Sequence, residues 1–258
     1  MNLEPLNAFG EAMYEMLDAH FLSVVIVVGT IMVTPIYVMA TYVFSGASAR
    51  KGWQIGCTFL LWGAFMFWVC LGQIPGKLGV PGNLIVPAAW VLPSLILYWQ
   101  RDWFLSRELS QKWLVGLQIF RLIGGVFLIE MAMGHIPGIF AYPAGIGDLL
   151  VGTVAIAVLL LNRNSERIPG NMIVIIIVIG MADFLNAFFF GFFSSPVPVQ
   201  IFFPAIENRN IYFPTGMIPL FLVPYAIFFH FLSLFNYLKF QRPNPDKSES
   251  IATKARRH

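Results

Sequence analysis

Apolar residues gather along the chain in seven long windows, separated by short segments that hold most of the charged and turn-forming residues. A helix needs about 20 apolar residues to cross roughly 30 Å of hydrocarbon, so windows of this kind predict transmembrane helices. They cover residues 21–44, 53–72, 84–99, 113–133, 140–161, 172–193 and 217–238. The third window is short and contains Pro87 and Pro93. The pattern predicts an all-α integral membrane protein with seven transmembrane helices.

The composition supports the same class and narrows the range of partners. Hydrophobic residues make up 58% of the chain and charged residues only 11%, whereas about a quarter of the residues in an average soluble domain are charged. The lipid bilayer is therefore the main expected partner. The basic C-terminal segment predicts attraction to anionic lipid and no binding of nucleic acid, and the sequence makes no prediction of an oligomeric state.

The distribution of lysine and arginine predicts the orientation, because basic residues are retained on the cytoplasmic side. With seven spans, only Lys77 and Arg209 fall on the side of the N-terminus. The other side holds Arg50, Lys51, Arg101, Arg107, Lys112, Arg163, Arg167, Lys239, Arg242, Lys247, Lys254, Arg256 and Arg257. We therefore expect residues 1–20 as an acidic extracytoplasmic leader, 21–240 as the seven-helix domain and 241–258 as a basic cytoplasmic tail.

Two of the predicted outer turns share a sequence pattern, which suggests an internal repeat. At a constant spacing, Gly72, Ile74, Pro75, Gly76, Pro81, Leu97 and Arg101 match Gly134, Ile136, Pro137, Gly138, Pro143, Leu159 and Arg163. The pattern favours one leading helix followed by three helical hairpins of one orientation, and parallel repeats of this kind place a transporter's site near the midplane. Chance similarity between membrane turns rich in glycine and proline is the alternative.

Three charged residues, Arg121, Asp148 and Asp183, lie inside apolar windows. A charge at the bilayer centre costs at least about 2.5–3.5 kcal/mol, so such residues face the protein interior and often belong to a site. Counted at about 1.5 Å per residue from the ends of their windows, all three fall near mid-membrane. Because an unpaired charge in hydrocarbon is costly, we expect Arg121 to form an ion pair with at least one of the two aspartates.

Two amides extend this constellation. Gln118 is one helical turn from Arg121, and Asn186 is one turn from Asp183, so each pair shares a helix face. One arginine and two aspartates sum to a single negative charge. One carboxylate of such a group can exchange a proton or hold a cation, which a proton- or sodium-coupled carrier requires. A buried ion pair that only fixes helix packing is the structural alternative.

The start of the fifth window combines Pro143, Gly145 and Gly147 just before Asp148. These residues disfavour a continuous helix, yet the apolar run that follows them is short for a span. We therefore expect a re-entrant or unwound segment, with Asp148 at the start of the helical half. Non-helical backbone at this depth is tolerated where it lines a cavity, which favours a site there.

Four titratable residues, His20, Glu130, His135 and Glu207, map to the outer interface. Glu130 and His135 are secondary site candidates, as the acid and base of an enzyme acting at that surface. Two histidines and two carboxylates could also bind a metal, but no HxxxH or HExxH spacing supports a metal site. The favoured interpretation is that these histidines lie at the membrane interface without binding a metal. We predict no metal and no cofactor. His230, alone on the last window, is expected to be a packed or hydrogen-bonded core histidine.

Ten residues between positions 118 and 152 form a distinctive pattern: Gln118, Arg121, Gly124, Pro137, Phe140, Pro143, Gly145, Gly147, Asp148 and Gly152. This pattern resembles one found in uncharacterised bacterial multi-pass membrane proteins. The resemblance implies a location in the bacterial inner membrane and brings no known activity.

Three functional hypotheses follow. The first is a carrier or binding protein for a small solute, a cation or a proton, whose core residues Arg121, Asp148 and Asp183 have Gln118 and Asn186 as neighbours. The second is a membrane-embedded enzyme at the outer interface, and the third is a non-catalytic subunit or scaffold. A carrier predicts a cavity that reaches the polar core, an enzyme predicts an outer cleft beside His135, and a scaffold predicts neither.

Overall fold

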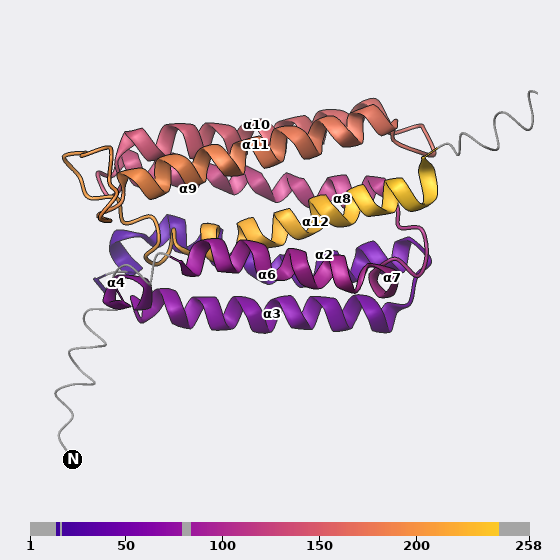
Figure 1. The fold of residues 1–258 in the computed structure, drawn as a ribbon, viewed down its shortest axis with the longest axis horizontal. Coiled ribbons are helices and arrows are strands. Elements are labelled where there is room, and N and C mark those ends of the chain that lie inside the picture. The colour runs from indigo at the N-terminus through magenta and orange to yellow at the C-terminus, as the bar shows by residue number, and fades with distance from the viewer. Residues whose placement is uncertain (1–13, 16, 79–83, 243–258) are drawn as a thin grey trace, which may run out of the picture.

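The chain forms a bundle of helices without a strand over residues 14, 15, 17–78 and 84–242, which the computed structural model describes (Figure 1). Six helices are long and apolar enough to cross a membrane. They are α2 (Phe21–Phe44), α3 (Ala49–Leu71), the composite helix Gln111–Ala132, α10 (Gly138–Leu161), α11 (Gly170–Ser194) and the composite helix Ile218–Gln241. Each coincides to within a few residues with an apolar window of the sequence.

The third apolar window forms α6 (Ile85–Trp99), which is shorter than the others. Its 15 residues extend over about 22 Å, less than the roughly 30 Å of a hydrocarbon core. Short helices flank it, α4 (Ile74–Leu78) before it and α7 (Arg101–Phe104) after it. The predicted helix is present, whereas its crossing of the membrane stays a prediction.

The centre of the bundle is α12 (Val223–Asn236). In Figure 1 this helix lies between the layer of α10 and α11 and the layer of α3 and α6. Nearly all of its side chains are buried, as expected for a helix that is apolar all round. The ring of Phe59 packs edge to face on Tyr225 and Phe228, with ring centres 5.0 and 5.2 Å apart. The last span is therefore the core around which the others pack.

The outer surface of the bundle is apolar. Large hydrophobic side chains are more than half exposed along several helices, among them Met32, Ile36, Leu61, Phe65 and Val178. Soluble monomers rarely expose contiguous apolar surface of this extent. The surface is suited to hydrocarbon instead of water.

The loops that carry basic residues meet at one end of the bundle. Arg107 Nη1 donates a hydrogen bond to Gly46 O at 2.5 Å, across two of these loops. Lys239 Nζ lies 2.7 Å from Asp102 Oδ1, and the hydrogen bond and charge of Lys239 lower the pKa of the Asp102 carboxyl. The basic residues thus gather at one end, as the orientation predicts. Of the predicted leader and tail, residues 1–13, 16 and 243–258 lie outside the described residues.

The predicted break at the start of the fifth window is wrong, because α10 is one continuous helix with Pro143 inside it. Proline is tolerated in transmembrane helices, where neighbouring groups satisfy the freed backbone carbonyl. The glycines serve packing: a Cβ on Gly145 would lie 2.9 Å from Leu128 Cγ. Asp148 consequently lies in the middle of a full helix instead of at the start of a half-helix.

Backbone irregularity occurs instead in the two composite helices. The first consists of α8 (Gln111–Gly116), the 3₁₀ helix η1 (Leu117–Gly124) and α9 (Gly125–Ala132). The last begins with a π turn, η2 (Ile218–Leu222), and ends with another, η3 (Tyr237–Gln241). A 3₁₀ run as long as η1 is uncommon within a helix and often marks a functional position. This run carries Arg121.

The two turns of the suggested repeat differ in backbone. After α9, the residue with left-handed backbone is Gly134, at φ +78°, and α10 begins soon after it. After α3, that residue is Gln73, at φ 51°. It is followed by α4 and by residues 79–83, which include Pro81 and lie outside the described residues. The repeat and the three-hairpin arrangement stay predictions.

Candidate functional site

Arg121, Asp148 and Asp183 meet in the middle of the bundle. Arg121 Nε lies 2.7 Å from Asp148 Oδ1, and Arg121 Nη2 pairs with Asp183 Oδ2. Arg121 Nη1 donates to Gly180 O at 3.3 Å, and the guanidinium lies 3.9 Å from the centre of the Phe184 ring. None of the three charged residues is more than 8% exposed. The predicted ion pair is confirmed, and the arginine engages both aspartates. We call these three residues the ionic core.

Glycines bring the helices close enough for these ion pairs. A Cβ on Gly147 would collide with Asp183 Oδ1, and a Cβ on Gly124 would collide with the side chain of Asp148. Small residues at such positions let transmembrane helices approach closely. Each carboxylate therefore lies directly against the backbone of a neighbouring helix.

His230 of α12 lies beside the ionic core. Its side chain is 1% exposed, so the expectation of a buried core histidine is confirmed. A Cβ on Gly180 would meet the imidazole and would lie 3.0 Å from Arg121 Nη1, which means that the two side chains share the space above Gly180. Sequence spacing gave no sign of this proximity, because His230 and Arg121 are far apart along the chain. The polar group thus draws on four helical segments instead of three.

The two predicted amide neighbours do not join the ion pairs. Gln118 is buried on η1, and within the described chain its Oε1 has no hydrogen-bond partner. Asn186 is half-buried on α11. Among the described residues, neither amide hydrogen-bonds to the ionic core. The hydrogen bonds of Arg121 go instead to the two aspartates of the core and to Gly180 O. Their part in the site stays a prediction.

The ionic core carries more negative charge than Arg121 balances. One guanidinium faces two carboxylates, and no other lysine or arginine of the described chain pairs with them. Asp183 Oδ1 and His230 Nε2 are buried, and neither has a hydrogen-bond partner within the part of the chain described. Because buried polar atoms are nearly always satisfied and a charge in hydrocarbon needs a counter-charge, the site is suited to a proton or a small cation.

A cavity of about 60 Å³ connects the ionic core with the loop between α11 and η2. Its wall includes Asp148 in mid-span and Ser195 and Asn210 in that loop. Aromatic side chains line it: Trp90, Phe127, Phe140, Phe184, Phe188 and Phe192. Aromatic faces attract cations, and a volume of about 60 Å³ has room for a few water molecules or one small cation.

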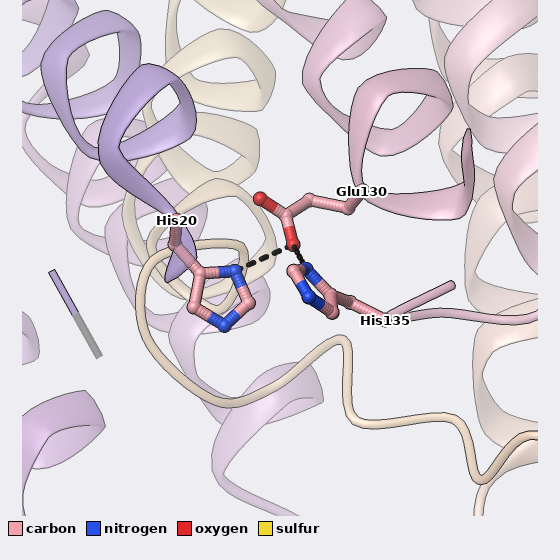
Figure 2. A group of neighbouring side chains, drawn as sticks. All are labelled: His20, Glu130 and His135. Atoms are coloured by element: carbon pink, nitrogen blue, oxygen red, sulfur yellow. Dashed lines mark hydrogen bonds and ion pairs between the residues drawn. The ribbon is translucent and has the colours of Figure 1, made fainter. Parts of the chain in front are cut away.

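The secondary candidates Glu130 and His135 lie together at the end of the bundle opposite the basic loops, where His20 joins them (Figure 2). Glu130 follows Arg121 along the same composite helix, so it lies about 15 Å from Arg121 along the axis. Glu207 pairs with Arg209 at 2.8 Å and takes no part in the cluster. The cluster is therefore a second polar site, separate from the ionic core.

Long apolar helices, an apolar outer surface and a buried ionic core define the class: this is a multi-pass helical membrane protein. Residues 82–238 match the model of a family described as a domain of unknown function, DUF8737. Because the match covers more than half of the chain, the chain belongs to this family. The matched region holds the whole ionic core, Glu130 and His135, whereas His20 precedes it. No curated protein and no solved structure matches the chain.

Proposed function

We propose that this protein is a membrane carrier or binding protein for a small cation, which binds at Asp148 in the ionic core. The observation that carries the proposal is the aromatic cavity whose wall includes Asp148, a carboxylate in a group with one excess negative charge. A scaffold needs neither the second carboxylate nor the cavity. An enzyme at the outer surface would not need a cavity that reaches mid-span.

The paired aspartates suggest how the site can exchange its occupant. A cation at Asp148 competes with Arg121 for the carboxylate, and Arg121 then keeps its ion pair with Asp183. Breaking an isolated buried pair is costly because it leaves an unpaired charge. Here the second aspartate prevents that outcome, so Asp148 can alternate between the arginine and a cation or proton.

We further propose seven spans, with α6 as the third, the N-terminus outside and the C-terminus inside the bacterial inner membrane. The gathering of basic loops at one end of the bundle supports this orientation. The location in the bacterial inner membrane is what the resemblance suggested by the sequence pattern of residues 118–152 implies. In this orientation the cavity lies in the outer half of the bundle.

Cysteines placed at Ser48 and at Gln200 are expected to react with a membrane-impermeant reagent from opposite sides of sealed cells. Ser48 lies between α2 and α3, and Gln200 lies between α11 and η2. The native cysteines, Cys57 and Cys70, are first replaced so that only the introduced thiols react. Labelling of both positions from the same side would contradict the seven-span arrangement.

Purified protein in liposomes is expected to take up sodium or methylammonium, supplied separately as radioactive probes, when the interior is made negative. Asp148→Asn should lower the uptake at least about 10-fold, since removal of a charged partner costs at least about 1.4 kcal/mol of binding. The asparagine keeps the shape of the side chain, and Asp183 still pairs with Arg121. Thermal unfolding of the variant checks that it is folded.

Glu207→Gln is the matched control, because Glu207 is an exposed carboxylate paired with Arg209 outside the ionic core. Its uptake should equal that of the unchanged protein. If neither probe is bound or taken up above the level of protein-free liposomes, the scaffold hypothesis is the better one. Equal uptake by Asp148→Asn and by the unchanged protein would show that the cation does not bind at Asp148.

A further inference from the structure

His20, Glu130 and His135 converge on one point at the end of the bundle opposite the basic loops. His20 Nδ1 lies 2.6 Å and His135 Nδ1 lies 2.8 Å from Glu130 Oε2. The imidazole centres are 4.2 Å apart, and one ligand atom from each residue lies within 4.8 Å of the others. Figure 2 shows both rings directed at the same carboxylate from different segments of the chain.

The backbone builds this cluster from a helix end and a helix start. Glu130 lies in the last turn of α9, and the chain then turns through Gly134, whose φ is +78°. His135 N donates to Glu130 O at 2.9 Å, a helix-ending hydrogen bond that a glycine in this conformation permits. The turn brings His135 back to Glu130. His20 directly precedes α2, which packs against α9 and supplies the third side chain.

The carboxylate at the centre has no permanent counter-charge. Glu130 is 1% exposed, and no lysine or arginine of the described residues pairs with it. Its Oε1 accepts a hydrogen bond from the Ser23 hydroxyl, and its Oε2 faces the two imidazoles. Burial of a carboxylate without a full opposite charge is costly. A divalent cation bound by the same three side chains would supply that charge.

We propose that His20, Glu130 and His135 bind a divalent transition-metal ion of the zinc type. Two imidazoles and one carboxylate are a ligand set that zinc accepts, with a fourth position for water. Ligand atoms around a tetrahedral zinc ion are about 3.3 Å apart, so each N···O separation has to widen by less than about 1 Å. The metal takes the place of the N–H protons, and each ring carries its proton on Nε2 instead.

The surroundings of the cluster fit such a site. The His20 and His135 side chains are 22% and 30% exposed, so an ion can reach them from water and a water molecule can occupy the fourth position. Ser23 holds the other carboxylate oxygen and so fixes the orientation of the ligand. The bound ion would fasten the start of α2 to the end of α9.

Purified full-length protein without a polyhistidine tag, stripped with a chelator, is expected to bind one zinc ion per chain in calorimetric titration. Zinc should also raise the thermal unfolding temperature. His135→Ala and Glu130→Gln are expected to weaken binding at least about 100-fold, and Ser23→Ala about 10-fold, because it removes only the contact that orients the carboxylate. Cobalt(II) should give the visible absorption of a four-coordinate site, and this absorption should disappear in His135→Ala.

Glu207→Gln is the matched control and should bind zinc as the unchanged protein does, since Glu207 lies outside the cluster. Unfolding measured in chelator checks that each variant is folded. If Glu130→Gln does not fold, His20→Ala and His135→Ala carry the test, because both side chains are partly exposed. Binding of less than one zinc ion per chain by the unchanged protein would overturn the proposal. The same conclusion would follow if a variant with His20, Glu130 and His135 all replaced bound zinc as tightly as the unchanged protein does.

Discussion

Replacement of Arg121 by leucine is expected to lower the free energy of unfolding by about 3–5 kcal/mol, a large part of the stability of a typical domain. The guanidinium pairs with both Asp148 and Asp183. Its removal leaves two carboxylates without a counter-charge inside an apolar bundle, where each unpaired charge destabilises the folded protein. Reversible unfolding in mixed micelles, followed by circular dichroism, measures the loss.

The size of this loss should depend on the carboxylates that remain. Arg121→Leu combined with Asp148→Asn and Asp183→Asn is expected to be more stable than Arg121→Leu alone, because the added changes remove the unpaired charges. Arg209→Leu is the control, since an exposed ion pair such as that with Glu207 contributes at most about 1 kcal/mol. Strictly additive losses in the combined variant would show that the three residues do not share one site.

Gly147→Ala is expected to destabilise the protein by about 1–3 kcal/mol, the usual cost of overpacking. Its Cβ would occupy the position of Asp183 Oδ1, so α10 and α11 would have to separate and the ion pair with Arg121 would be disturbed. Gly29→Ala in α2 is the matched control. A Cβ there meets no atom within 4 Å, and alanine is favoured over glycine in a helix by about 1 kcal/mol.

The two alanine variants should therefore shift stability in opposite directions. Thermal unfolding of both, measured side by side in the same lipid or detergent, tests the contact geometry of the ionic core. If the Gly147→Ala variant were as stable as the Gly29→Ala variant, α10 and α11 would not approach each other as closely as described.

The helices were predictable because their cause is local. An apolar run of about 20 residues has few alternatives to a membrane helix, and the bounds of α2 coincide with the first window. The break expected at Pro143 and Gly145 was not found, because a glycine in a helix can have either of two effects. It can destabilise the helix, or it can let a neighbouring helix pack closely. The position of Leu128 against Gly145 shows that the second effect applies here. The 3₁₀ geometry of η1 had no signal in the sequence.

The candidate sites were predictable in part, for a similar reason. Arg121, Asp148 and Asp183 stood out because charges within apolar windows have few partners except one another. His20 was expected at the outer interface with Glu130 and His135, and His230 was expected in the core. Their contacts could not be predicted, since they come from tertiary packing of helices distant in sequence. Gln118 and Asn186 share helix faces with charged residues, but among the described residues they make no hydrogen bond to them. A shared face places side chains on one side of a helix without bringing their polar atoms into contact.

The 3₁₀ geometry of η1 couples the length of the helix that carries Arg121 to the rotation of its two ends. A 3₁₀ residue rises about 2.0 Å and turns about 120°, against about 1.5 Å and 100° for an α-helical residue. Conversion of the eight residues of η1 to α-helix would shorten this helix by about 4 Å and rotate α9 against α8 by nearly half a turn. Arg121 cannot keep both aspartates through such a motion, and Glu130 cannot keep its place between His20 and His135. The pitch of η1 therefore determines how Arg121 and Glu130 are placed relative to each other, both along the helix axis and around it.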